Sequence, residues 1–255
     1  LLERNPELRD RRRVSMDYQR PQPVLPAWLR LWFPPTMAII VIASKILNPD
    51  FYRDWIIHEI GLVELATPLA AIIGAVFGVL LIKRLLPTRD WLIIGWAATV
   101  TLACIYFAGE ELSWGQQLFH WSTPEAIDKL NDQHETNLHN MSSWFDQKPR
   151  ALLELWVVIG GILVPVREWK RGSPFTQGGL FYWFWPTMDV LPTAIMAELI
   201  RAPQRLKHVI GVKQLPVEIR WSEPQEYYFA LFLAFYLASL YIRSKGRAPA
   251  TTRTS

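Results

Sequence analysis

Two adjacent carboxylates stand at the end of a long apolar segment of this chain. Glu110 and Glu111 follow the almost entirely apolar run from Trp91 to Phe107. A charged side chain at the end of a membrane-spanning helix is costly, so these two carboxylates require a local partner or a function. The chemistry that carboxylates perform in such a place is proton transfer or metal binding. We therefore take this pair as the first candidates for a working site.

A second run of side chains able to bind a metal lies downstream, between Gln133 and Asn140. Imidazole and carboxylate groups are the ligands that zinc and related divalent metals take in proteins. The sequence therefore favours a divalent metal such as zinc as a cofactor, although it does not fix one. The predicted metal ligands are Glu111, His120, His134 and His139, and the predicted catalytic groups are Glu110, Glu111 and His134.

The spacing of the two downstream histidines does not fit the common zinc-protease motif. HExxH places its histidines four residues apart on one face of a helix, whereas His139 follows His134 by one residue more. On a helix the two rings would diverge by about 140°. A loop could still bring both rings to one ion. The alternative is that the His and Asn side chains of this segment tie down a polar surface loop by hydrogen bonds.

Helical spacing predicts different surroundings for the two glutamates. Glu110 and Trp114 are four residues apart and share a face, while Glu111 points about 100° away. One carboxylate should face the interior of the protein and the other the head-group boundary or the following loop. A structural role is the alternative to chemistry, in which either glutamate caps backbone donors or pairs with Arg53 or Arg150.

The elements that must position these residues are membrane helices. The chain is 51% hydrophobic with 13 Trp, and its apolar residues are clumped rather than spread at amphipathic spacing. Several clumps approach the roughly 17–25 residues that cross a bilayer. We predict an all-α polytopic transmembrane bundle of about six spans, with an extracytoplasmic helical insert at 110–150. A soluble helical bundle is disfavoured because the segment 60–82 carries only Glu64 as a charge. The predicted spans are 28–47, 60–82, 91–112, 152–169, 180–200 and 226–242.

The fifth predicted span is the most unusual because it contains Pro186, Asp189 and Pro192. Prolines are tolerated in membrane helices when neighbours satisfy the freed carbonyls, so this segment is either a kinked span or re-entrant. A carboxylate inside a membrane is a functional candidate by default, and Asp189 could couple ion or proton transport. The alternative is that Asp189 bonds to Ser, Thr, Trp or backbone groups of a neighbouring element.

Lys and Arg residues in the flanks predict the orientation. Lys and Arg are frequent in the arm 1–27, in the two loops on the same side and in the tail 244–255. Both termini should therefore be cytoplasmic. The transmembrane bundle between them is predicted at 28–243. The arm lacks an apolar signal segment, so the first span must direct its own insertion. The basic stretch 201–220 conflicts with this orientation. We attribute the net charge of +4 to topology and to anionic lipids rather than to nucleic acid.

Four short motifs resemble a family of bacterial polytopic inner-membrane proteins. They are GEELSWGQ at 109–116, TPE at 123–125, ETNLHN at 135–140 and QKPR at 147–150. The resemblance implies a bacterial inner-membrane location and carries no activity. The paired glutamates are also similar to those of the CPBP-type intramembrane proteases. That family's EExxxR motif would place arginine at position 115, where this chain has Gly115, and its FxxxH motif is not found in a suitable span.

Three functional hypotheses follow. The first is a membrane hydrolase or transferase that acts on a lipid or lipid-linked substrate, with Glu110 or Glu111 as general base. The second is an accessory or scaffold subunit of a larger membrane complex, in which the GxxxG motif at Gly74 and Gly78 packs against a partner or within the protein. The third is a transporter that depends on Asp189.

Overall fold

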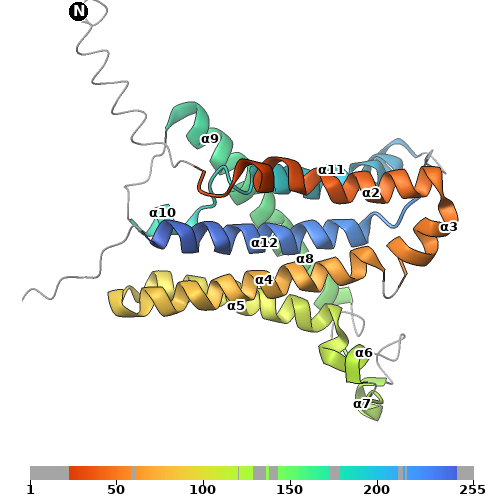
Figure 1. Ribbon diagram of the computed structural model, residues 1–255, viewed down its shortest axis with the longest axis horizontal. Coiled ribbons are helices and arrows are strands. Elements are labelled where there is room, and N and C mark those ends of the chain that lie inside the picture. The colour runs from red at the N-terminus through yellow and green to blue at the C-terminus, as the bar shows by residue number, and fades with distance from the viewer. Residues whose placement is uncertain are drawn as a thin grey trace, which may run out of the picture.

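The computed structural model is a bundle of long helices (Figure 1). It describes residues 23–58, 61–119, 121–128, 136–137, 143–172, 179–211, 215 and 217–245. No strand is present among these residues, so the predicted all-α polytopic bundle is confirmed. Most of the predicted arm at 1–27 and of the predicted tail at 244–255 lies outside the described residues.

Within the described part of the chain, five helical segments are long and apolar enough to cross a membrane. In several of them the helix changes type without a break, so that η1 (Trp28–Trp32) continues into α2 (Phe33–Leu47). The fourth joins α8 (Ser143–Trp156), η5 (Val157–Leu163) and α9 (Val164–Arg171). The five segments are Trp28–Leu47, Leu62–Thr88, Trp91–Glu111, Gln147–Arg171 and Ser222–Ser244.

Short elements connect the long ones. A turn of α3 (Pro49–Phe51) and η2 (Tyr52–Ile56) follows α2, and η3 (Leu86–Thr88) joins α4 (Leu62–Leu85) to α5 (Trp91–Glu111). The remaining elements are η4 (Ser113–Gly115), α6 (Gln116–Phe119), α7 (Glu125–Asp128), α10 (Leu180–Phe184), α11 (Leu191–Ile210) and α12 (Ser222–Ser244).

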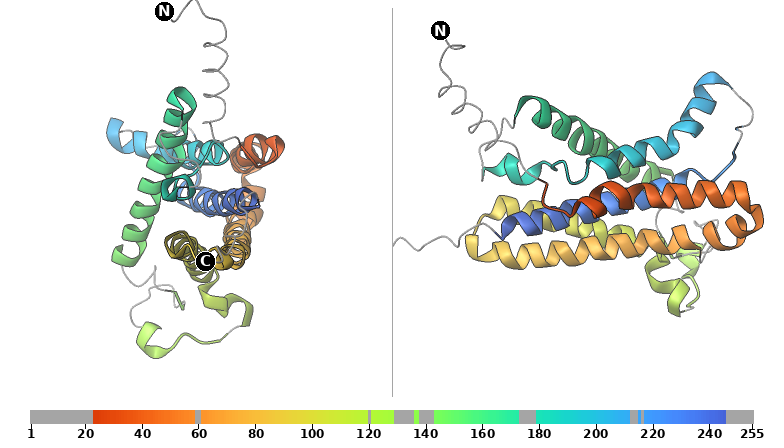
Figure 2. Two further views of the ribbon diagram at one scale, coloured as in Figure 1. Left: turned by 90° about the vertical axis from the view of Figure 1, so that its left-hand side faces the viewer. Right: turned by 45° about the horizontal axis from the view of Figure 1, so that its top comes forward.

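The last long helix, α12, is the central element of the bundle. It runs between α2 and α11 on one side and α4 and α5 on the other, and the end-on view places it in the middle (Figures 1 and 2). All residues from Phe229 to Leu240 are buried, including Phe232 and Tyr236. A helix that is apolar on every side is stable only when other helices or lipid surround it, which explains why the other spans gather on α12.

The GxxxG motif packs within the protein. A methyl group added at Gly74 would lie 3.0 Å from Cys104 Sγ and 3.2 Å from the backbone of Ala234, so this glycine allows α4 to approach both α5 and α12. A methyl group at Gly78 would collide with the hydroxyl of Thr101 and lie 2.9 Å from its Cβ. Small residues permit such close approach of membrane helices.

The segment predicted as a kinked or re-entrant fifth span is interrupted between α10 and α11. The chain leaves α10 at Trp185, whose extended conformation is the one that a following proline imposes, and it re-enters a helix only at Leu191. The helix α11 then continues to Ile210 and carries Arg201 and Arg205, so it is too polar to count with the five apolar segments.

Although it is polar, α11 carries the chain along the bundle beside α2 and α12 (Figure 1). The backbone amide of Val24, before the first helix, donates to Asp189, and Ser239 near the end of α12 donates to the same carboxylate. The described chain therefore begins and ends at the same end of the bundle, which we call the terminal end. The opposite end, where Arg220 N donates to Tyr52, is called the site end.

The close approach of α4 and α5 predicts that an added methyl group destabilises the protein at Gly78 and not at Gly95. We expect Gly78→Ala to lower the free energy of unfolding by about 1–3 kcal/mol, because the buried Thr101 cannot move freely away from the new methyl group. The matched control is Gly95→Ala on α5, where an added Cβ meets nothing within 4 Å and helix propensity should raise stability by up to about 1 kcal/mol. Thermal unfolding in mild detergent measures both, and equal effects would contradict the packing.

Candidate functional site

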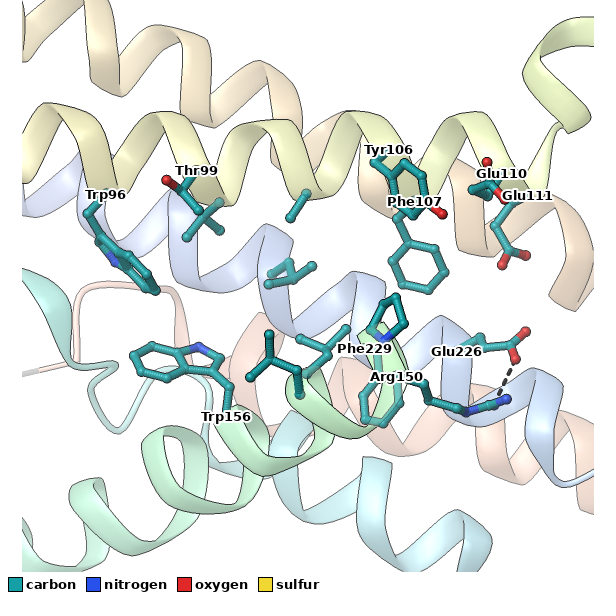
Figure 3. Close-up of a pocket in the computed structure, with 16 residues that line it drawn as sticks. Trp96, Thr99, Tyr106, Phe107, Glu110, Glu111, Arg150, Trp156, Glu226 and Phe229 are labelled. Carbon is teal, nitrogen blue, oxygen red and sulfur yellow. Dashed lines mark ion pairs between the residues drawn. The ribbon is translucent and has the colours of Figure 1, made fainter. Parts of the chain in front are cut away.

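A cavity of about 470 Å³ lies between α5, the continuous helix α8–η5, and α12 (Figure 3). We call it the groove. Most of its wall is apolar, and its polar side chains gather near the site end. The lining residues are Trp96, Thr99, Val100, Ala103, Tyr106, Phe107, Glu110, Glu111, Pro149, Arg150, Leu152, Leu153, Trp156, Glu226, Phe229 and Leu233.

Each of the three helices contributes one face to the groove. On α5 the lining residues recur every three or four positions from Trp96 to Glu110, which is the spacing of one helical face. Trp96 closes the apolar end of the groove together with Trp156, whose ring centroid lies 5.3 Å away. The indole of Trp96 donates to the hydroxyl of Tyr236 at 2.7 Å, so the apolar end is fixed against the central helix.

An ion pair closes the opposite end of the groove. Arg150 on α8 pairs with Glu226 in the first turn of α12 at 2.7 Å, and it also donates to the backbone oxygen of Ser222 at 3.2 Å (Figure 3). Both side chains are largely buried. A guanidinium that binds both a carboxylate and a backbone carbonyl fixes the position of α8 against the start of α12. The predicted pairing of Arg150 with Glu110 or Glu111 is therefore replaced by this pair.

The two glutamates of α5 face different surroundings. The buried Glu110 accepts a hydrogen bond from the indole of Trp114 at 2.7 Å, whereas the carboxylate of Glu111 points toward Arg150 and Glu226 (Figure 3). The helix ends at Glu111 and does not continue to Trp114, which the helical spacing had placed on the same face as Glu110. Trp114 has a φ of 54°, so it returns to Glu110 through a left-handed turn rather than along a helix.

Carboxylates from three helices gather behind this end of the groove. Glu111 interacts electrostatically with Glu226, Glu64, Arg150 and Glu223, in that order. We call Glu64, Glu111, Glu223 and Glu226 the carboxylate cluster. Glu223 pairs with Arg220 at 2.9 Å and lies within hydrogen-bonding reach of Glu64. Several carboxylates held this close together in a largely apolar setting require neighbouring positive charge or protons.

The contributions of α12 to this site were not predicted from the sequence. Glu223 and Glu226 lie in the first turns of an apolar helix, where a carboxylate requires a partner, and this signal is the same one that identified Glu110 and Glu111. Arg150 was considered only as one partner among several. Its pairing with Glu226 depends on the return of α8 to α12, which no local pattern in the sequence specifies.

Two described residues of the insert, Thr136 and Asn137, contact the turn that follows α5. The amide of Asn137 donates to Ser113 Oγ at 3.3 Å, and both side chains are buried. The backbone amide of Thr136 donates to Gln116 Oε1 at 2.6 Å, while Gln116 Nε2 donates to Thr123 Oγ1 at 2.9 Å. These bonds connect three of the four sequence motifs.

The predicted metal site falls mostly on positions that the structure does not describe. His120, His134 and His139 lie outside the described residues, so of the predicted ligands only Glu111 is placed. Among the described residues, no group of three or more His, Cys, Asp or Glu side chains is arranged to hold a metal ion. The metal site and the catalytic role of His134 stay predictions.

Asp189 is occupied by structural hydrogen bonds. Its buried carboxylate accepts from the backbone amides of Val24 and Leu25, both at 2.9 Å, and from the hydroxyls of Thr187 at 2.9 Å and Ser239 at 2.7 Å. This arrangement joins the start of the first helix, the break before α11 and α12. It matches the alternative in which Ser, Thr and backbone groups satisfy this residue.

The basic stretch at 201–220 is largely neutralised by neighbouring groups. Arg205 forms ion pairs with Glu154 and Glu198, and Lys207 pairs with Glu218 at 2.8 Å. The hydrogen bond from Lys207 lowers the pKa of Glu218 below its ordinary value. The orientation rule counts Lys and Arg and not net charge, so the orientation of this stretch stays a prediction.

No protein-family model matches the chain, and neither the curated proteins nor the solved structures show a significant similarity to it. The fold and the groove therefore define the class of protein by themselves. It is an all-α membrane protein whose helices enclose an apolar groove with an ion pair and carboxylates at one end.

The ion pair at the groove should contribute measurable coupling between α8 and α12. We expect Arg150→Gln to destabilise the protein by about 3 kcal/mol, because Glu226 then stays largely buried without its guanidinium. The double variant Arg150→Gln/Glu226→Gln should recover part of this loss, with a coupling energy of about 1–3 kcal/mol. A double-mutant cycle on unfolding in detergent tests this, and strictly additive effects would show that the pair does not join the helices.

Asp189→Asn should act on stability and not on the groove. Loss of the charge weakens four hydrogen bonds, so we expect a destabilisation of about 1.5–3 kcal/mol. The control is Asp50→Asn, an exposed carboxylate on α3 whose replacement should change stability by less than about 0.5 kcal/mol. A transport function for Asp189 requires the opposite pattern, in which stability is kept and ion-coupled uptake into proteoliposomes is lost.

Proposed function

We propose that this protein binds a lipid or a lipid-linked molecule in the groove between α5, α8–η5 and α12. The observation that carries the proposal is the polarity of the groove, which is apolar along its length and charged at one end. An amphiphile has the same distribution, with a chain for the apolar wall and a head group for the charged end. The volume of about 470 Å³ is typical of sites for small molecules.

The groove is accessible from the side of the bundle. Leu152 lines it and is 71% exposed, and Ala103 on the facing helix is also exposed. In a membrane these surfaces face acyl chains rather than water. A lipid could therefore enter between α5 and α8 from the surrounding bilayer, without first leaving it.

A catalytic role for Glu111 is the second candidate function. Its carboxylate faces the groove, where it could take a proton from a hydroxyl of the head group or from water. Arg150 could stabilise negative charge that develops at the same position. This would make the protein a hydrolase or transferase that acts on the bound lipid, with the histidines of the insert as further groups.

The other two hypotheses have less support. The GxxxG motif of the scaffold hypothesis is used within the protein, between α4, α5 and α12. Asp189, on which the transporter hypothesis rests, accepts four short hydrogen bonds that join three segments of the chain. Other subunits of a complex stay possible partners, but no described surface argues for one in particular.

We also propose that the terminal end faces the cytoplasm of a bacterial cell and that the protein lies in its inner membrane. Arg84 and Arg243 lie at the terminal end, where Arg84 donates to the backbone oxygen of Ser244. Lys170 and Arg171 end α9. Basic residues at the ends of spans favour the cytoplasmic side. The charged end of the groove would then lie toward the outer leaflet.

Filling the groove should expel its ligand. We expect Ala103→Trp to reduce the amount of lipid that stays bound after purification by at least about tenfold, because the indole takes the space of the chain. The matched control is Leu102→Trp, one position earlier on α5, which points about 100° away and outside the groove. Mass spectrometry of lipids extracted from each variant measures the loss. Equal lipid content in both variants and in the parent protein would end the proposal.

A further inference from the structure

We infer that the groove selects an amphiphile whose head group carries a protonated amine. The inference rests on the proposed function, since it names the chemistry of the ligand that the groove would hold. It starts from an unequal distribution of charge at the polar end, where Glu110, Glu111 and Glu226 line the groove and Arg150 is the lining cation.

The guanidiniums near this end are already engaged. Arg150 is paired with Glu226 at 2.7 Å, Arg220 with Glu223 at 2.9 Å, and Arg201 donates to Gln225 at 2.7 Å. Glu111 points into the groove but forms no ion pair or hydrogen bond with a described residue. Three of the four charged groups that interact with it electrostatically are other carboxylates. Three carboxylates therefore line this end beside one lining cation, Arg150, which is already paired with Glu226, so Glu111 lacks a positive charge of its own.

A cationic head group would supply that charge. Burying a carboxylate in an apolar setting is unfavourable unless a positive charge and hydrogen-bond donors accompany it. An ammonium group carries one positive charge and three donors in a small volume, which suits a site with several carboxylate acceptors. Its apolar chain would then extend along α5 toward Trp96 and Trp156, at the closed end of the groove.

An anionic head group fits this end less well. A phosphate would lie near Glu110, Glu111 and Glu226, and like charges in a medium of low polarity repel strongly. A phosphate that approached Arg150 would also compete with Glu226 for the same guanidinium, at the contact that joins α8 to α12. A neutral head group brings no positive charge, so it could bind only if protons neutralised the carboxylates. The charge of the head group is therefore the property that the site should distinguish.

The experiment compares three probes with the same chain: dodecylamine, dodecanol and dodecyl phosphate. Each is added to the purified protein in neutral detergent at pH 7, and the bound fraction is measured by native mass spectrometry. We expect the amine to bind at least about tenfold more tightly than the other two. Glu111→Gln should remove this preference while binding of dodecanol is kept, which also shows that the variant is folded. The control Asp50→Asn, which removes an exposed carboxylate on α3, should leave the preference unchanged.

Two kinds of failure can be told apart with the Ala103→Trp variant. If all three probes bind equally and Ala103→Trp weakens each of them, the groove holds amphiphiles without selecting an amine, and only this inference is overturned. The inference is overturned in the same way if the amine preference survives in Glu111→Gln. If the probes bind equally well to the parent protein and to Ala103→Trp, the groove is not their site, and the proposed function fails as well.

Discussion

The structure depends on the polar attachment of an apolar helix at both of its ends. Between Phe229 and Tyr236 the buried side chains of α12 are apolar and offer contacts that do not fix direction or register. Near its ends, Glu226 binds Arg150 and Ser239 binds Asp189. Polar interactions are costly to leave unmade in an apolar setting, so these two attachments define how the remaining helices lie around α12.

The groove is a consequence of the attachment at the site end. The Arg150–Glu226 pair holds the start of α8 at the start of α12, while the rings of Trp96 and Trp156 meet at the other end of the same face. Between these two contacts α8–η5 stays apart from α5, and small side chains such as Ala103 leave space. The same charges that fix the helices are therefore placed where a ligand's head group would lie.

The sequence predicts the class of fold because membrane helices are encoded locally, by length and apolar content. Five of the six predicted spans correspond closely to the five long apolar segments of the structure. Pro186 and Pro192 indicated an interruption in this segment, whereas the partners of Asp189 could not be predicted, because the amides of Val24 and Leu25 are far away in sequence. Part of the site could be predicted from the sequence. Glu110 and Glu111 were visible as charges at a helix end, whereas Glu226 became part of the site only through the long-range return of α8.

The most direct test of the account is to ask which molecules touch the groove inside the membrane. A photoreactive benzoylphenylalanine would be placed at position 103, within the groove, or at position 102, on the adjacent outer face of α5. The account predicts that position 103 captures one chemical class of lipid, while position 102 captures the general mixture of membrane lipids. The same distribution of lipids at both positions would contradict it.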